Sequence, residues 1–534
     1  MPKQAIGHQA YDWNAIIAEV AVRKHQHYSA LEGGDFTALL ATLKQANQTP
    51  FSQLDSYMLY GAAAILGRSQ SEATAVLAYQ SRLNEKTRAV TLFFWAQEAA
   101  AHLQHATAIG LIKPLVELFP KDPELNSLIA ICYQQQQNLA DGWDYIKEGV
   151  KHTPDHVGLN SSLGQYYLAE GRLTEAEATA RYILTLDHNN VTAFNLLSRT
   201  APNRIFDDLI THFTALAESH TCGPVNSAGL MFDLGRIYDS RGSYELAFCA
   251  IEAANTLMKN IPQTTKSSFD ETVEFANFSK RRDILANIPQ LEVVADITPV
   301  FIVGLPRTGS TLLDQALATH PDVASLGETP SVPHVVQETI ALQEGGHHRE
   351  AISHLEAWRT RYLAQATATN PHARFLIDKT LGNSRHMGFL KKLFPNAKFL
   401  HVRRNFMDTG LSIYFAPLLR TNVYATDLAA IAGFIALDEK IIKSWAHRGH
   451  GALEVRYEDM VGDMEQTLIR AFKYIGLSWH ADCLNFHEKK RAVHTYSAHQ
   501  VRKAVYKSSQ GRWQNYANQL VPCQEALRDR GIAA

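Results

Sequence analysis

The residues best suited to chemistry in this 534-residue chain lie in the segment Pro299–Leu317, PVFIVGLPRTGSTLLDQAL. An apolar run leads into a loop bounded by Gly304 and Gly309, and a helix-like segment follows. This spacing is typical of a phosphate-binding loop, in which backbone N–H groups and a helix N-terminus face an anion. Ser310 stands where such loops usually carry lysine, and Arg307 lies inside the loop. Hydroxyls and a guanidinium without that lysine suit a nucleotide whose reactive end is not a triphosphate.

Further polar residues follow the apolar runs of the same half of the chain. Glu328 lies beyond the helix that the loop begins, Lys379 follows the second apolar run, and Arg404 follows the third. Ser412 comes eight residues after Arg404. An arginine at a strand end and a hydroxyl about two helical turns further on can together bind a second phosphate. Taken singly, Glu328 also fits a surface carboxylate, Lys379 a solvated lysine at a strand end, and Ser412 a helix hydroxyl bonded to its own backbone. The joint order of these residues is what favours a site. Arg403 is expected to pair with a carboxylate instead.

A parallel sheet is the element that could bring these residues together. Four short apolar runs indicate buried strands, and helical segments long enough for crossovers separate them. The expected fold is a P-loop-like, three-layer α/β domain with a parallel sheet, and ligands bind such domains at the carboxyl ends of the strands. The expected strands are Pro299–Gly304, Ala373–Asp378, Lys398–Val402 and Ala452–Tyr457.

The preceding half of the chain has a helical period. A motif of small and aromatic residues occurs at Leu163–Ala176 and again, with the same internal offsets, at Leu234–Ala247. A weaker copy lies at Ile129–Gly142. The motif resembles the tetratricopeptide repeat, in which small residues let paired helices approach each other. The expected domains are a helical tetratricopeptide-repeat α-solenoid over residues 1–285, with the clearest repeats over 120–255, and the α/β domain over 286–534.

Composition limits the partners and the compartment. With 51 Lys and Arg against 53 Asp and Glu, the net charge of −2 gives no electrostatic reason to expect nucleic-acid or anionic-membrane binding. The five cysteines have no CxxC spacing, which indicates neither a disulfide framework nor a zinc site. The N-terminus lacks the apolar core of a signal peptide, and no apolar run is long enough for a membrane span. We therefore expect a soluble, cytoplasmic protein.

From about residue 299 to 525, the order of these motifs resembles sulfotransferases that use 3′-phosphoadenosine-5′-phosphosulfate (PAPS). The stretch GLPRTGSTLLDQALATHPDVASLGET, residues 304–329, is similar to the tyrosylprotein sulfotransferase branch in detail. The resemblance implies that the loop binds the 5′-phosphosulfate and that Arg404 and Ser412 bind the 3′-phosphate. It also implies that the segment Gly511–Trp513 closes on the nucleotide. The nucleotide-binding residues implied are Arg307, Thr308, Gly309, Ser310, Thr311, Arg404, Ser412, Arg512 and Trp513.

The same resemblance implies the catalytic residues. It places Glu328 on the catalytic base, Lys379 on the catalytic lysine, and Ser497 on a serine that stabilises the transition state. Sulfuryl transfer to a hydroxyl independently requires a base, an in-line arrangement, and donors where negative charge gathers. We expect Glu328 to take the acceptor proton and the other two side chains to stabilise the bridging oxygen and the sulfuryl group. The product would be 3′-phosphoadenosine-5′-phosphate (PAP), and no metal is required.

The acceptor stays open among peptide tyrosine, carbohydrate and small molecules, and a homo-oligomer is also open. A solenoid groove can hold a peptide, which by analogy favours a protein or peptide partner. Two other functions compete: a tetratricopeptide scaffold with a nucleotide-sensing or degenerate domain, and an atypical P-loop kinase. The joint presence of Glu328, Lys379 and Ser497 argues against degeneration. The missing loop lysine and the lack of a clear magnesium-holding aspartate argue against a kinase.

Overall fold

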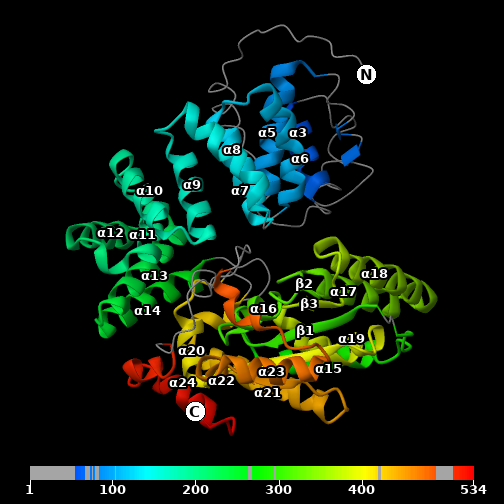
Figure 1. The fold of residues 1–534 in the computed structure, drawn as a ribbon. Coiled ribbons are helices and arrows are strands. Elements are labelled where there is room, and N and C mark those ends of the chain that lie inside the picture. Colours follow the sequence, from blue (N-terminus) through cyan, green and yellow to red (C-terminus); the bar gives the residue numbers. More distant parts are fainter. Residues whose placement is uncertain are drawn as a thin grey trace. The chain divides into compact units, whose positions relative to one another are not determined.

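The structure is a computed structural model that describes residues 54–66, 73–74, 76–77, 83–102, 104–136, 138–261, 268–293, 296–418, 422–488 and 509–533. The chain divides into two compact units, one ending at Thr200 and the other starting at Ala201 (Figure 1). The domain boundary expected near residue 285 follows a change in sequence period, and it stays a prediction. We describe each compact unit separately.

The described part of the first unit is rich in helix. Its helices are α3 Leu54–Leu66, α5 Glu85–Ala101, α6 His105–Leu118, α7 Pro123–Gln135, α8 Leu139–His152, α9 Val157–Glu170, α10 Leu173–Leu186 and α11 Val191–Thr200. Tyr166 is buried, and its hydroxyl donates to the carbonyl of Ala130 at 2.6 Å. A Cβ at Gly142 would lie 1.7 Å from that hydroxyl oxygen, so only glycine lets α8 approach α9 this closely. The helical half is as expected, whereas its identification as a tetratricopeptide array stays a prediction.

Four helices open the second unit, ahead of its sheet-containing part. They are α12 Asp207–Ser219, α13 Pro224–Ser240, α14 Tyr244–Asn260 and α15 Glu271–Leu285. The α13 and α14 helices form a close pair, in which a Cβ at Gly235 would lie 2.6 Å from Cδ1 of Ile251. The ring of Phe248 stacks on that of Tyr414 with centroids 5.6 Å apart, and Asn255 donates to the Tyr414 carbonyl at 3.0 Å. These contacts fix the α13–α14 pair against the α/β part of the same unit.

A five-stranded parallel sheet with the order β2-β3-β1-β4-β5 forms the centre of the second unit. Its strands are β1 Thr298–Gly304, β2 Val323–Ser325, β3 Phe375–Asp378, β4 Lys398–Arg403 and β5 Leu453–Arg456. All four expected strands are present, and the parallel arrangement is confirmed. The expectation missed β2, because three residues are too few to show a strand period. This short strand pairs with β3 at the edge of the sheet.

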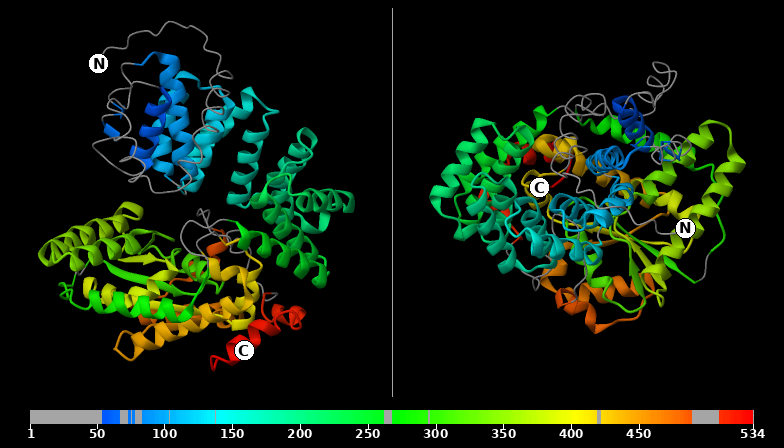
Figure 2. Two further views of the ribbon diagram at one scale, coloured as in Figure 1. Left: turned by 180° about the vertical axis from the view of Figure 1, so that it is seen from behind. Right: turned by 90° about the horizontal axis from the view of Figure 1, so that it is seen from above.

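Helices cover both faces of the sheet (Figures 1 and 2). Every residue of β1 after Thr298 is buried, and successive side chains of a strand point to opposite faces, so both faces must be covered. Within the described part of the chain, no helix has the length and apolar character needed to cross a membrane. The helices after β1 are α16 Ser310–Leu317, α17 Ser331–Glu344, α18 His348–Thr369, α19 Met387–Leu393, α20 Phe406–Tyr414, α21 Leu428–Ala446, α22 Tyr457–Gly462, α23 Met464–Ile475 and α24 Val521–Arg528.

Candidate active site

The strand order places several of the expected site residues next to one another at the carboxyl ends of the strands. The central strand β1 lies between β3 and β4, and the chain reverses its direction of progress across the sheet at this strand. Ligands of open parallel sheets bind at such a point, outside the carboxyl ends of the strands. The loop after β1 is therefore flanked by Lys379, which follows β3, and by Arg404, which follows β4. Glu328 follows β2, the strand that pairs with β3.

Backbone geometry explains the two glycines of the loop. Gly304 has φ 133° and Gly309 has φ 95°, a region that side-chain-bearing residues rarely adopt. A Cβ at Gly304 would lie 2.6 Å from the carbonyl oxygen of Val402, and one at Gly309 would lie 2.6 Å from the ring of Tyr457. Arg307 also has a positive φ, 69°, which is uncommon without glycine and concentrates at functional sites. The loop is thus held in a specific shape at the N-terminus of α16.

The hydroxyl residues of the loop are packed inward. Thr308 is buried and donates to the carbonyl of Leu305 at 2.8 Å. Ser310 and Thr311 begin α16 and are also buried. The chain therefore presents the main-chain N–H groups of the first turn of α16 beside the loop, as an anion site at a helix N-terminus requires.

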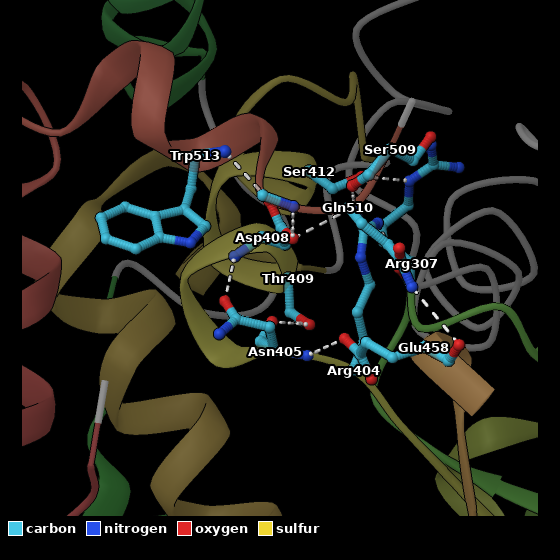
Figure 3. A network of polar contacts seen from close by, with 11 residues as sticks. Arg307, Arg404, Asn405, Asp408, Thr409, Ser412, Glu458, Ser509, Gln510 and Trp513 are labelled. Carbon is cyan, nitrogen blue, oxygen red and sulfur yellow. Dashed lines mark hydrogen bonds and ion pairs between the residues drawn. The ribbon is translucent and has the colours of Figure 1, made fainter. Parts of the chain in front are cut away.

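Arg307, Arg404 and Ser412 meet on one side of the loop, and we call them the arginine cluster. The Nε of Arg307 donates to the hydroxyl of Ser412 at 3.0 Å, and Arg404 donates to the carbonyl of Arg307 at 3.3 Å (Figure 3). Arg404 also donates to the Ser509 carbonyl and lies over the ring of Tyr457, 4.8 Å from its centroid. Burial lowers the pKa of Arg404, and the nearby Asp408 carboxylate opposes that shift. The structure thus brings together both residues expected to hold a second phosphate.

Asp408 of α20 is a site residue that the sequence did not single out. It is buried, and its two carboxylate oxygens accept the backbone N–H groups of Gly511 at 2.8 Å and Trp513 at 3.0 Å (Figure 3). Its Oδ2 also lies 3.9 Å from the Arg404 guanidinium. The signal available was an aspartate four residues after Arg404, in the first turn of the helix that begins at Phe406. Asp408 ties the strand-end arginine to the C-terminal segment, residues 509–516.

Glu328 and Lys379 form an ion pair on the other side of the loop. The Lys379 side chain is only 2% exposed, whereas that of Glu328 is 55% exposed. The backbone N–H of Lys379 donates to the Gly327 carbonyl at 2.8 Å. The Thr380 hydroxyl accepts the Thr329 N–H and donates to the Thr329 carbonyl, both at 2.9 Å. These bonds hold the two segments in register, with a buried cation beneath an accessible carboxylate.

Asp378 anchors the strand end that carries Lys379. This carboxylate is buried and accepts hydrogen bonds from the Tyr362 hydroxyl at 2.9 Å, the Thr380 N–H at 2.9 Å and the Asn383 amide at 3.2 Å. Burial raises the pKa of Asp378, while these hydrogen bonds oppose the shift. A buried polar network around Asp378, the last residue of β3, therefore supports the Glu328–Lys379 pair.

The remaining expected residues differ in whether they contact the arginine cluster and its supports. Trp513 joins the site through its backbone N–H, which donates to Asp408. The Arg512 guanidinium pairs with Asp239 of α13 at 2.9 Å and lies over the Phe415 ring, so its expected nucleotide contact stays a prediction. Ser497 lies outside the described residues. Arg403 pairs with two glutamates, as expected.

Comparison with known proteins identifies the class of this domain. Residues 299–481 match the model of the sulfotransferase family, so the C-terminal region of the chain contains a sulfotransferase-family domain. The matched region includes the loop, the Glu328–Lys379 pair and the arginine cluster. The C-terminal segment lies beyond it.

The relatives are distant and partial. An uncharacterized protein of Aquifex aeolicus is 27% identical over 430 residues, which cover 76% of this chain and 55% of that protein. Protein-tyrosine sulfotransferase 2 of Gallus gallus is 27% identical over 203 residues, which cover 36% of this chain and 54% of that protein. The chain thus spans about half the length of these curated relatives. The solved sulfotransferase domain of the Synechococcus PCC 7002 olefin synthase aligns at 20% identity and a TM-score of 0.32, over 42% of this chain and 90% of that one.

Proposed function

We propose that this chain transfers a sulfuryl group from PAPS to an acceptor hydroxyl, with a protein or peptide tyrosine as the first acceptor to test. The observation that carries the proposal is the arrangement around the loop after β1. The arginine cluster lies on one side and the Glu328–Lys379 pair on the other. One side suits phosphate binding, and the other suits proton removal.

The arginine cluster fits a phosphate group in charge and geometry. Two guanidinium groups and a hydroxyl lie within hydrogen-bonding reach of one another or of shared partners. Among the described residues, the Nε of Arg404 is buried without a hydrogen-bond partner. A buried donor of this kind costs free energy until an acceptor meets it. A phosphate oxygen of the donor substrate would be such an acceptor.

The Glu328–Lys379 pair suits the transfer step. Glu328 is accessible to an incoming hydroxyl and would take its proton as the acceptor oxygen bonds to sulfur. The bond between sulfur and the 5′-phosphate oxygen breaks, and PAP leaves. Lys379 is a fixed, buried cation that would stabilise the negative charge gathering on the transferring group. No metal is needed for this balance of atoms and charge.

The acceptor class is supported by two features outside the loop. The relative from Gallus gallus is named a protein-tyrosine sulfotransferase, and it matches 36% of this chain. The helix-rich N-terminal half, which we propose to be a tetratricopeptide solenoid, is an architecture that often presents peptides. Sulfation of tyrosine peptides, absent when the tyrosine is phenylalanine, would support this class. Sulfation of only carbohydrate or small phenols would reject it.

Calorimetric titration with PAP, ADP and ATP in metal-free buffer tests the donor. We expect PAP to bind at least about tenfold more tightly than ADP or ATP, because only PAP carries the 3′-phosphate. Arg404→Ala should weaken PAP binding by about tenfold or more. Arg403→Ala is the matched control, since Arg403 pairs with Glu439 and Glu454. Preference for ATP with magnesium would favour a kinase, and no nucleotide binding would favour the scaffold.

A further inference from the structure

The C-terminal segment, residues Ser509 to Tyr516, forms one wall of the arginine cluster although it lies beyond the region that matches the sulfotransferase family. The carbonyl of Ser509 accepts a hydrogen bond from Arg404 (Figure 3). Two residues further on, Asp408 accepts the backbone N–H of Gly511. The orientation of the Arg404 guanidinium therefore depends on where this segment lies.

The opposite side of the C-terminal segment is held by Asp239, from helix α13 of the helix-rich half. Its Oδ2 lies 2.9 Å from Nη2 of Arg512, and its Oδ1 accepts the Tyr516 hydroxyl at 2.6 Å. Tyr516 is fully buried and packs edge-on against the ring of Tyr244, 5.4 Å between centroids. One carboxylate from α13 thus holds both ends of a short 3₁₀ turn, Arg512–Tyr516.

Main-chain and side-chain contacts alternate along the segment. The backbone groups at positions 511 and 513 bind Asp408, while the side chains at positions 512 and 516 bind Asp239. The segment is therefore fixed between α20, which carries Ser412, and α13. Asp408 holds only the backbone of the turn, so without the Asp239 contacts the packing of the Tyr516 ring on Tyr244 and Phe248 would be what holds the turn toward the α13–α14 pair.

We infer that Asp239 is a positioning residue for the donor substrate. Asp239 lies on a helix outside the matched domain, and by fixing the C-terminal segment it fixes the orientation of the Arg404 guanidinium. The inference rests on the proposed function, because PAP is the ligand whose affinity it governs. It makes the α13–α14 pair a structural part of the nucleotide site. Asp239 itself touches neither donor nor acceptor in this scheme.

The test uses the full-length chain and measures the dissociation constant for PAP together with kcat and KM for PAPS. Asp239→Asn should weaken PAP binding by about tenfold and raise the KM for PAPS similarly, with kcat changed less than about threefold. Asp239→Glu should recover part of the affinity. Asp207→Asn is the control, because it removes an α12 carboxylate that pairs with Arg241 at the end of α13.

Tyr516→Phe gives a gentler perturbation that removes a single hydroxyl from the same carboxylate. It should weaken PAP binding by about threefold, and less than additively when combined with Asp239→Asn. Hydrogen exchange at the Gly511 and Trp513 amides should accelerate in both variants, a readout that needs no nucleotide. If the wild type binds PAP and Asp239→Asn binds it with the same affinity, the inference about Asp239 is wrong, while the proposed function stands. A wild-type chain that does not bind PAP overturns the proposed function as well.

Discussion

The two sides of the loop after β1 are assembled in different ways. The arginine cluster draws on distant parts of the chain: Arg307 and Ser412 are 105 residues apart, and Arg404 and Ser509 are also 105 residues apart. The Glu328–Lys379 pair joins only two segments, 51 residues apart, which lie after neighbouring strands. The first side is a fold-wide assembly and the second is a local one.

This difference indicates how binding and chemistry divide. Disturbing any part that supports the arginine cluster should change donor affinity, because each part fixes a guanidinium or the segment beside it. Disturbing the Glu328–Lys379 pair should change the rate, because an exposed carboxylate above a buried cation contributes little to holding a nucleotide. Substitutions on the two sides should therefore separate KM from kcat.

The largest effect is expected on the local side. Glu328→Gln removes the group proposed to take the acceptor proton and should lower kcat by about 10²- to 10⁴-fold. The PAP dissociation constant should stay within about twofold, since the arginine cluster is untouched. Glu338→Gln is the control, because Glu338 is an α17 carboxylate that pairs with His354. Turnover close to wild type would remove Glu328 from the role of base.

A smaller effect is expected on the arginine side. Ser412→Ala removes the hydroxyl that accepts from Arg307 at 3.0 Å, a loss of about 1 kcal/mol that corresponds to about fivefold weaker PAP binding. kcat should be nearly unchanged. Ser444→Ala on α21 removes a hydroxyl that also accepts from an arginine, Arg448, and provides the control. If Ser412→Ala reduced kcat without changing PAP affinity, the division between the two sides would fail.

The strands and the strand-end residues were predictable because they are local features of the sequence. A buried apolar run followed by a polar residue predicts both a strand and what its carboxyl end presents. This reasoning placed Lys379 and Arg404 at strand ends. Glu328 was singled out through the resemblance to tyrosylprotein sulfotransferases, and Ser412 through its spacing of eight residues from Arg404. Local reasoning also found the glycine loop, whose spacing reflects backbone angles that glycine adopts at low cost.

The supporting contacts could not be predicted in the same way. Asp408 was visible only as a helix residue, because its partners Gly511 and Trp513 come more than 100 residues later. Asp239 lies 273 residues before Arg512, in a half of the chain whose pattern indicated only helix packing. No sequence period relates residues that meet only through tertiary folding. The three-residue β2 was missed for a different reason, its length.

The smallest expected effect concerns β2, the strand that precedes Glu328, and the pH dependence of the stability around it. His320, between α16 and β2, is buried, and its Nδ1 accepts the Asp322 N–H at 3.0 Å. Burial lowers the pKa of His320 below 6.5, the nearby His480 lowers it further, and Asp322 opposes the shift. Because the unfolded chain takes up this proton first, the stability contribution is complete above about pH 6.5 and is lost as pH falls toward the lower folded pKa.

Urea unfolding between about pH 5 and 7.5 should therefore show a lower free energy of unfolding in acid, by no more than about 1.4 kcal/mol per pH unit for this one proton. His320→Asn keeps an acceptor for the Asp322 N–H without a titrating group, so its pH slope should be shallower than that of the wild type. Equal pH slopes in the two proteins would show that His320 does not destabilise the β2 support in acid.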